Sequence, residues 1–276
     1  MSVTPLEAPR PGRADRARRS RPNPWIAHGA ADREPRFSLI CFPAGGGSGA
    51  FFRPWASGAV HAGLRVRPVQ LPGRERRLGE TPFRHLEPLV EALHLHLTDE
   101  LSPPYALFGH SMGALVAFAL ARALARDGGP LPEVLVVAGF PAPDRFRPRE
   151  EPTYLASDAK VVHRLQAFGG TPPAILENPE LMALVLPTLR ADFSVVETYL
   201  HRPATPLPVP VVAYGGRGDP SVSPRDLAAW RDHTARPFRA RLFPGGHFFL
   251  EEDRAGFLAT LREDLTPYVE RESILP

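Results

Sequence analysis

A serine with a glycine two positions away on either side is the strongest chemical signal in the sequence. Ser111 lies in Gly-His-Ser-Met-Gly at 109–113. This pattern arises by chance in roughly one chain in ten of this length, so its setting decides its meaning. The apolar run 105–108 precedes it, and a helix-forming stretch begins at Met112. A strand, a tight turn and a helix in that order expose the hydroxyl at a helix N-terminus, so the motif predicts a serine nucleophile.

A serine hydroxyl needs a base that takes its proton. In enzymes with this kind of turn the chain order is nucleophile, acid, histidine, so we expect the base late in the sequence. His247 follows Pro-Gly-Gly directly after a strand-like run, whereas His233, the other late histidine, lies in a helix-like stretch. We therefore expect His247 to be the base. We interpret His110, beside the nucleophile, as a structural residue.

Two aspartates compete to be the acid that orients this base. Asp219 follows the strand-like run 209–214 through a glycine-rich turn, and Asp144 follows the preceding run 134–140 in the same way. Carboxyl ends of parallel strands are where such sheets place their chemistry, so either position fits. We favour Asp219 and keep Asp144 as the alternative.

Acyl transfer also requires backbone donors for the oxyanion that forms on the attacked carbonyl. The amide that follows the nucleophile, on Met112, is the first candidate. The second is expected from a loop after an early strand, and Pro-Ala-Gly-Gly-Gly at 43–47 is such a loop. It lacks the Gly-Lys-Ser/Thr of a phosphate-binding loop and the glycine spacing of a dinucleotide site, so nucleotide binding is disfavoured.

The elements that must hold these residues alternate between strand-like and helical stretches from residue 37 onward. Strand-like runs occupy 37–42, 65–71, 105–108, 134–140, 209–214 and 239–243. The stretch 112–126 is helical by composition and ends at Asp-Gly-Gly. The alternation is typical of an α/β fold with a mostly parallel sheet covered by helices on both faces.

A long connection separates the fourth and fifth strand-like runs and must have structure of its own. Ser157 or Asp158 can cap one helix, which Gly-Gly at 169–170 would end. Asn178 followed by proline can open a longer one that reaches about Leu200, with Pro187 as a kink. We interpret the segment of about 145–205 as a helical lid. Two packing helices that gate nothing remain the alternative.

Length, composition and charge distribution indicate the domain organisation and disfavour one class of partner. The chain has 276 residues, of which 43% are apolar, enough for one sizeable core. Residues 1–36 contain 8 arginines and 4 acidic residues, a net charge of +4, whereas the whole chain has a net charge of +3. The remainder is therefore close to neutral and shows no basic stripe, so nucleic-acid binding is disfavoured. We expect residues 1–35 to be a flexible Arg- and Pro-rich segment and 36–276 to form one domain.

The lack of a recognisable targeting signal and the low cysteine content lead us to expect a cytoplasmic protein, because a reducing compartment suits a chain with a single cysteine. Pro-Asn-Pro at 22–24 follows the N-terminal arginines, so the apolar core of a signal peptide is missing, and we find no run of about 18 apolar residues that could span a membrane. The single cysteine, Cys41, excludes a disulfide framework and a structural zinc site.

Taken in order, four motifs resemble those of the type II thioesterases of polyketide and nonribosomal peptide synthesis. They are Cys-Phe-Pro and the following glycines at 41–47, Gln-Leu-Pro-Gly-Arg-Glu at 70–75, the serine motif at 109–113, and Phe-Pro-Gly-Gly-His-Phe-Phe-Leu at 243–250. The lid stretches 169–173 and 189–193 are also similar to this family, and the resemblance runs from residue 37 to the C-terminal helix.

The resemblance implies an α/β-hydrolase fold and an editing enzyme of antibiotic assembly lines. Such enzymes hydrolyse aberrant or stalled acyl thioesters from the phosphopantetheine arms of carrier proteins, without a cofactor. The family's catalytic residues fall on Ser111, Asp219 and His247. Relatives commonly read Phe-Pro-x-Ala-Gly-Gly where this chain reads Phe-Pro-Ala-Gly-Gly-Gly, so the second oxyanion donor is either Gly45 or Ala44.

The resemblance also implies an anionic partner, because the substrate arm carries a phosphate and carrier proteins are typically acidic. Arg74, Arg76 and Arg77 beside the Pro-Gly turn are the candidate contacts, although loop arginines are often merely solvated. We expect a monomer.

Three other functions remain open. A carboxylesterase or lipase acting on free esters would use the same triad, since a fold does not fix a substrate. A cyclising thioesterase is disfavoured, because no carrier domain precedes the domain in this sequence. A non-catalytic carrier-binding chaperone of the synthase is disfavoured by the intact triad.

Overall fold

The computed structural model describes residues 23–27, 37–56, 64–102 and 104–270. Six parallel strands form one sheet in the order β2-β1-β3-β4-β5-β6. The strands are β1 (Phe37–Phe42), β2 (Leu64–Pro68), β3 (Tyr105–His110), β4 (Val134–Ala138), β5 (Val211–Gly216) and β6 (Phe238–Phe243). All six expected strands are confirmed, and the expected α/β class with them.

Several strand ends differ from the prediction: β4 ends at Ala138 instead of 140, before Gly139 with its φ of 62°, and two other ends lie beside proline. The expected run 65–71 stops at Pro68 as β2, and β5 begins at Val211 rather than at 209. Proline has no N–H to donate to a strand ladder, so Pro210 cannot pair as a regular strand residue. Strand β3 extends two residues beyond the expected run and reaches His110, directly before the nucleophile.

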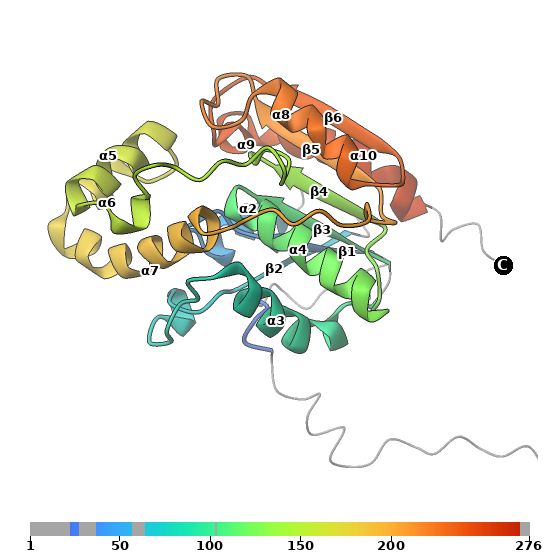
Figure 1. Cartoon of the computed structure of the whole chain (residues 1–276), viewed down its shortest axis with the longest axis horizontal. Helices are drawn as coiled ribbons and strands as arrows, with labels where there is room; N and C mark the ends of the chain where they lie inside the picture. The colour runs from blue at the N-terminus through green and yellow to red at the C-terminus, as the bar shows by residue number, and fades with distance from the viewer. Residues whose placement is uncertain (1–22, 28–36, 57–63, 103, 271–276) are drawn as a thin grey trace, which may run out of the picture.

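Helices cover both faces of the sheet (Figure 1). Side chains of β3 alternate between two cores: Leu107 packs with the face that carries α3, α4 and α8, and Phe108 packs with the face that carries α2 and α10. The helices are α2 (Arg53–Ala56), α3 (Leu86–Leu97), α4 (Met112–Asp127), α8 (Pro224–Ala228), α9 (Phe249–Glu252) and α10 (Arg254–Val269). Single 3-10 turns lie at Gly49–Phe52, Glu75–Arg77, Thr98–Glu100, Thr153–Leu155 and Ala229–His233.

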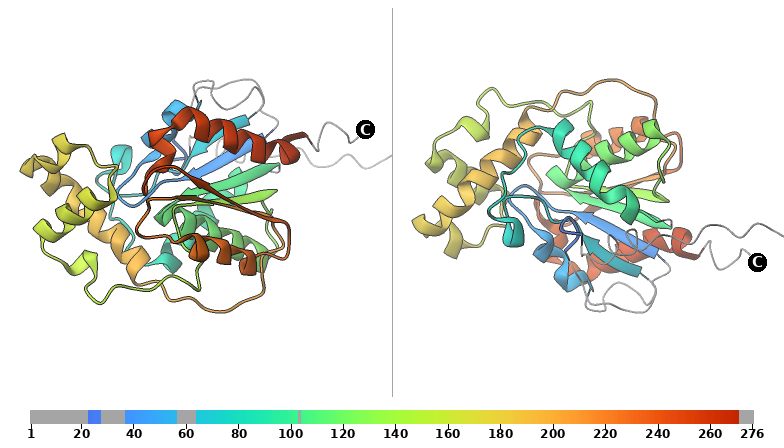
Figure 2. Two further views of the ribbon diagram at one scale, coloured as in Figure 1. Left: turned by 90° about the horizontal axis from the view of Figure 1, so that it is seen from above. Right: turned by 90° about the horizontal axis from the view of Figure 1, so that it is seen from below.

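The expected lid is a helical insertion between β4 and β5 that projects beyond the sheet (Figure 2). It consists of α5 (Asp158–Phe168), α6 (Pro173–Leu176) and α7 (Pro179–Glu197). The Asn178 side chain accepts hydrogen bonds from the amides of Glu180 and Leu181, which confirms it as a cap. The helices enclose a small core of their own, composed of Ala156, Val161, Leu165, Met182, Leu186 and Leu189. The short helix α6 was not expected from the sequence.

Part of the N-terminal segment packs on the domain, which corrects the expectation that 1–35 is flexible throughout. Ile26 pairs with Val69 next to the edge strand β2, and the amide of Gln70 donates to the Trp25 carbonyl. The Trp25 ring is buried, stacks on His96 and lies 4.1 Å under the Arg77 guanidinium. Residues 23–27 therefore belong to the folded unit, and the rest of the 1–35 prediction lies outside the described residues.

The other edge of the sheet is tied to the C-terminal helix by charge. Asp264 of α10 is buried and accepts hydrogen bonds from Arg239 and Arg241 of β6 and from the Tyr214 hydroxyl. Burial alone would raise the Asp264 pKa, but the bonds from Arg241 and Tyr214 outweigh it and hold that pKa below its usual value. In the described parts of the chain, we find no helix with the length and hydropathy needed to span a membrane.

Candidate active site

Ser111 occupies a strained turn between β3 and α4. Its φ of 54° is one of two positive values outside glycine among the described residues, and such backbone persists only where its surroundings enforce it. A Cβ on Gly109 would lie 2.1 Å from the Gly113 carbonyl oxygen, and one on Gly113 would lie 2.2 Å from that of Phe42. Both glycines are therefore required by the close approach of strand and helix, as the motif predicts.

Ser111, His247 and Asp219 form a hydrogen-bonded chain. The Ser111 Oγ lies 2.9 Å from His247 Nε2, and His247 Nδ1 lies 2.7 Å from Asp219 Oδ2. Nδ1 donates to the carboxylate, which leaves Nε2 as the acceptor for the serine proton. The geometry brings together the three residues that the sequence analysis selected, although 136 positions separate Ser111 from His247.

The Asp219 carboxylate is held ionised by its neighbours. Its second oxygen accepts from the Ser221 amide at 2.8 Å and from the Ser221 hydroxyl at 2.6 Å. Burial would raise the Asp219 pKa, but the hydrogen bonds from His247 and Ser221 outweigh it, and the pKa is lowered. The sequence analysis did not identify Ser221. A hydroxyl two residues after a strand-end aspartate is the signal that could have revealed it, because this spacing is typical of an Asx turn.

His110 is a neutral structural histidine, as expected. Its Nε2 donates to the backbone carbonyl of His247 at 2.9 Å, and its Nδ1 is buried without a hydrogen-bond partner among the described residues. Burial and the neighbouring His247 lower the His110 pKa to about 3. Through this hydrogen bond, the His110 ring helps to hold the loop that carries His247.

The alternative acid and the alternative base pair with each other instead of with Ser111. His233 Nε2 lies 2.8 Å from Asp144 Oδ1, beside Phe118 and His201. Because Asp219 already occupies the position next to His247 Nδ1, Asp144 is not needed there. The geometry therefore decides in favour of Asp219 as the partner of His247.

The glycine loop at 43–47 faces the same hollow as Ser111. Ala44 and Gly45 line it together with Met112 and His247. Within the described part of the chain, the amides of Ala44, Gly45 and Met112 donate to no other protein group, so Met112 and either candidate for the second donor are free to bind an oxyanion. The amide of Gly46 is engaged, since it donates to Asp192 Oδ2 at 2.7 Å.

Asp192, on the lid helix α7, joins the lid to this loop. Its carboxylate pairs with Arg74 through two hydrogen bonds of 2.8 Å, and the Arg74 guanidinium also donates to the Gly47 carbonyl. Both side chains are less than a tenth exposed. The pair therefore fixes the loop that carries the second oxyanion donor.

Two of the three arginines expected to contact substrate do not reach it, which corrects that prediction. Arg74 is buried against Asp192, and Arg77 is buried between Glu80, the Gln70 carbonyl and the Trp25 ring. Most N–H donors of these two guanidiniums are directed at protein groups and both side chains are buried, so neither is free to bind a phosphate. Arg76 is exposed and stays a candidate.

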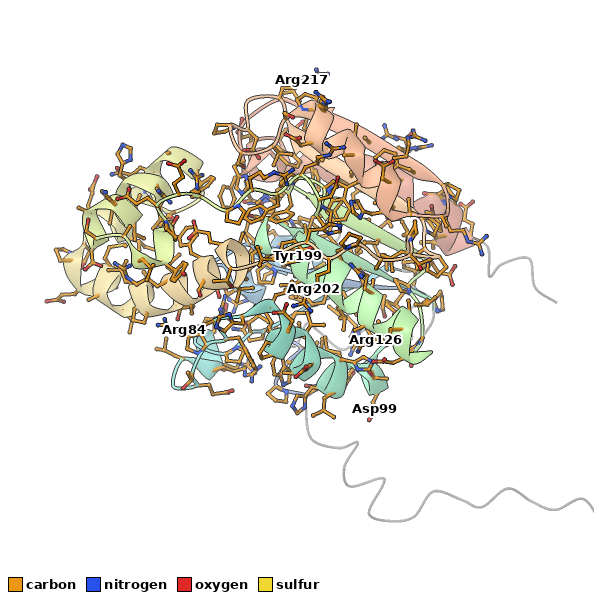
Figure 3. All side chains as sticks on the ribbon, in the orientation of Figure 1. Arg84, Asp99, Arg126, Tyr199, Arg202 and Arg217 are labelled. Atoms are coloured by element: carbon orange, nitrogen blue, oxygen red, sulfur yellow. The ribbon has the colours of Figure 1, made fainter. Side chains whose placement is uncertain are left out.

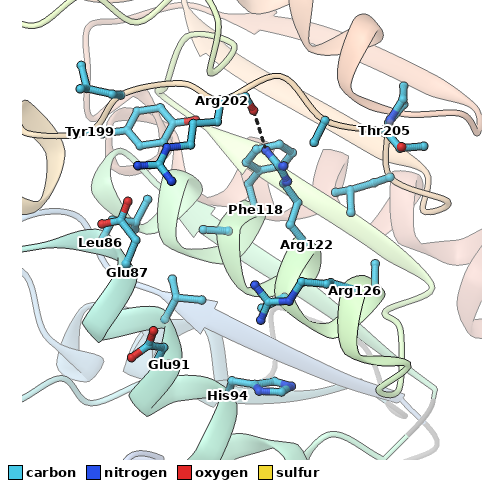
Figure 4. Close-up of a pocket in the computed structure, with 18 of the residues that line it drawn as sticks. Leu86, Glu87, Glu91, His94, Phe118, Arg122, Arg126, Tyr199, Arg202 and Thr205 are labelled. Carbon is cyan, nitrogen blue, oxygen red and sulfur yellow. Dashed lines mark hydrogen bonds between the residues drawn. The ribbon is translucent and has the colours of Figure 1, made fainter.

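The triad opens into a pocket of about 460 Å³ between the sheet and the lid, lined by residues such as Phe140, Leu165, Phe168 and Phe193. A larger groove of about 690 Å³ lies elsewhere, between α3, α4 and the strap 199–208 (Figure 4). Tyr199 and Arg202 at the start of this strap lie beside α4 (Figure 3). Among its described lining residues the larger groove has no serine or cysteine. The smaller pocket is therefore the candidate active site.

A parallel sheet with a serine turn after its third strand, a late histidine and a helical lid defines a serine hydrolase of the α/β-hydrolase class. Residues 37–265 match the family described as "Thioesterase domain". The chain belongs to this thioesterase family.

Two curated relatives and one solved structure show which members of the family this chain resembles. The chain is 36% identical to the gramicidin S biosynthesis protein GrsT of Aneurinibacillus migulanus, over 85% of this chain and 91% of that protein. It is 38% identical to thioesterase PikA5 of Streptomyces venezuelae, over 83% and 80%. Its fold is similar to the solved structure of the type II thioesterase BorB from the borrelidin biosynthetic cluster, with a TM-score of 0.81, 37% identity and coverage of 89% and 99%.

Proposed function

We propose that this protein is an editing thioesterase that hydrolyses acyl groups from the phosphopantetheine arms of carrier proteins in polyketide or nonribosomal peptide synthesis. The observation that carries the proposal is the continuous chain of hydrogen bonds from Ser111 through His247 to Asp219 in a member of the thioesterase family. The similarity to a type II thioesterase of the borrelidin cluster supports the editing role.

The mechanism follows from the atoms of the site. His247 Nε2 takes the Ser111 proton as Oγ attacks the thioester carbonyl, and the amides of Met112 and Gly45 stabilise the oxyanion. The pantetheine sulfur leaves and receives the proton from His247, which leaves an acyl-serine. His247 then takes a proton from water, the hydroxide attacks the acyl-serine, and the returning proton releases Ser111 and the free acid.

The proposal includes the surroundings in which the enzyme works. The steps above need no cofactor, because the substrate itself brings the phosphopantetheine. The partners are acidic acyl or peptidyl carrier domains, which meet the enzyme in the cytoplasm, and the enzyme acts as a monomer.

The test compares two substrates that share one acyl chain, an acyl carrier protein and the corresponding oxygen ester. We expect hydrolysis of the carrier thioester by the wild type and its loss in Ser111→Ala, by a factor on the order of 10³ or more. A fluorophosphonate should label Ser111 alone, as located by mass spectrometry. A tenfold or greater preference for the oxygen ester would instead identify an esterase.

A further inference from the structure

Three acids and three arginines line the active-site pocket, but their partners elsewhere in the protein leave an excess of positive charge. Two of its acids are neutralised from within the protein: Asp192 pairs with Arg74, and Glu197 lies 3.7 Å from Arg164 and accepts from Thr153. Asp226 is half-buried and accepts from the Ser223 hydroxyl. Against these stand three exposed arginines at 145, 147 and 149 that line the same pocket.

These arginines follow the carboxyl end of β4, on the segment that leads from the sheet into the lid. Arg145 pairs with Asp144 at 3.1 Å, so its charge is partly compensated. Arg147 donates to the backbone carbonyls of Asp144 and Phe146, which orients the guanidinium without neutralising it. Arg149 makes no hydrogen bond or ion pair with any other described residue. Two cationic groups without an acidic partner, Arg147 and Arg149, are thus exposed at the pocket, against one remaining carboxylate, Asp226.

We propose that Arg147 and Arg149 bind the phosphate of the phosphopantetheine arm, an inference that rests on the proposed function. The arm carries its thioester at one end and its phosphate at the other. When the carbonyl reaches Ser111, which is less exposed than these arginines, the phosphate stays toward solvent. Guanidinium groups match phosphate oxygens with paired N–H donors, so a rim of free arginines suits this ligand.

The same comparison explains why Arg74 and Arg77 at the Pro-Gly turn do not suit this role. There the guanidiniums of Arg74 and Arg77 are already committed to Asp192 and Glu80. The rim arginines, in contrast, line the hollow that contains the nucleophile. Recognition of the phosphate there would hold the arm in line with Ser111 and would discriminate against thioesters that lack an anionic tail.

The experiment measures hydrolysis of two soluble thioesters with one acyl chain, acyl-phosphopantetheine and acyl-pantetheine, which differ only in the phosphate. The wild type should prefer the phosphorylated substrate about tenfold in kcat/KM, through a lower KM, as one charge-assisted contact provides. The preference should shrink at high salt, because exposed charges are screened.

Arg149→Gln tests the proposal without loss of any internal contact, and the double variant Arg147→Gln/Arg149→Gln removes both cations. The double variant should raise the KM for acyl-phosphopantetheine about tenfold and thereby remove the preference for the phosphorylated substrate over acyl-pantetheine. Arg262→Gln is the matched control, since Arg262 is exposed on α10 and lines no pocket described above.

The outcomes separate this inference from the proposed function. Equal kcat/KM for the two thioesters in the wild type would overturn the phosphate site while thioesterase activity stands, and so would equal losses on both substrates in Arg149→Gln. If neither thioester is hydrolysed but the matching oxygen ester is, the proposed function fails and the phosphate site fails with it.

Discussion

At the scale of single residues, the Asp192–Arg74 pair has a testable role in catalysis. Asp192→Asn leaves Arg74 buried without a counter-charge, which typically costs about 3–5 kcal/mol of stability. Since Asp192 also accepts from Gly46, we expect a fall in kcat with little change in KM, because the oxyanion loop loses its anchor. Urea unfolding and steady-state kinetics on one acyl thioester measure both effects.

The lid offers a matched control for this substitution. Asp158 also pairs with an arginine of the lid, Arg190, but its side chain is 69% exposed. Exposed pairs contribute less than about 1 kcal/mol, so Asp158→Asn should leave both stability and kcat near wild type. If Asp192→Asn behaves like Asp158→Asn, the pair does not anchor the loop.

His110 gives the protein a defined dependence of stability on pH. Its pKa is lowered by burial and by His247 to about 3, below the ordinary 6.5 of the unfolded chain. The unfolded chain therefore binds one more proton between these values. Stability from this residue is complete above about pH 6.5 and falls by about 1.4 kcal/mol per pH unit below it. Urea unfolding between pH 4 and 6 measures this slope.

Replacement of single histidines isolates this contribution. His110→Gln should reduce the pH dependence of the unfolding free energy by about 1.4 kcal/mol per pH unit, the contribution of one proton. His163→Gln should leave this dependence unchanged, because His163 is exposed on the lid. The stability that Asp219 contributes through its lowered pKa is also lost on acidification, but only when the pH falls below the ordinary pKa of an aspartate. An unchanged slope in His110→Gln would show that another group titrates in this window.

The sequence allowed the triad to be assigned because each member follows the end of a strand. Topology brings those ends to one edge of a parallel sheet, so chain order was enough to choose Ser111 and His247. The arginines could not be assigned in this way. Arg74 meets Asp192 across 118 positions, and a loop arginine looks the same in sequence whether it is buried or solvated.

At the scale of elements, the junction of β3 and α4 depends on its two glycines. Gly113→Ala places a Cβ 2.2 Å from the Phe42 carbonyl oxygen, where only backbone movement could relieve the overlap. We expect a loss of about 3 kcal/mol or more in the free energy of unfolding, at the upper end of overpacking effects. Chemical denaturation of the purified variant measures this loss.

Gly79→Ala is the control for added volume. A Cβ at Gly79 would meet nothing within 4 Å, and its backbone is not left-handed. Its unfolding free energy should stay within about 0.5 kcal/mol of wild type or rise slightly. Equal stability of the two glycine variants would mean that the turn can widen without cost.

The elements themselves were predictable to different degrees. All six strands were, because buried parallel strands appear as short apolar runs between turn residues. The helix α6, which has only four residues, was not, because Pro-Pro followed by a few apolar residues carries no periodicity. The same limit applies to residues 23–27, which an isolated bridge at Ile26, the Trp25 ring and the Asn23 side chain attach to the domain.

At the scale of the whole molecule, Trp25 attaches residues 23–27 to the edge of the sheet. Its ring contacts His96 and Arg77 and is 4% exposed. Trp25→Ala should lower the free energy of unfolding by about 3 kcal/mol, as for other buried aromatic side chains. Leu95→Ala, on the neighbouring helix but 75% exposed, should change it little. Thermal and urea unfolding measure both variants, and equal losses of unfolding free energy would contradict a stabilising role for Trp25.

The distance along the chain between hydroxyl and imidazole has a consequence during biosynthesis. Chains fold as they leave the ribosome, N-terminal parts first. The serine turn is translated long before β5, β6 and the loop of His247, which lies 136 positions later. A nascent fragment that ends in the lid would present the strained serine without its base. We therefore expect hydrolytic competence to be acquired only late in translation, when β5, β6 and the loop of His247 join the four strands that precede the lid.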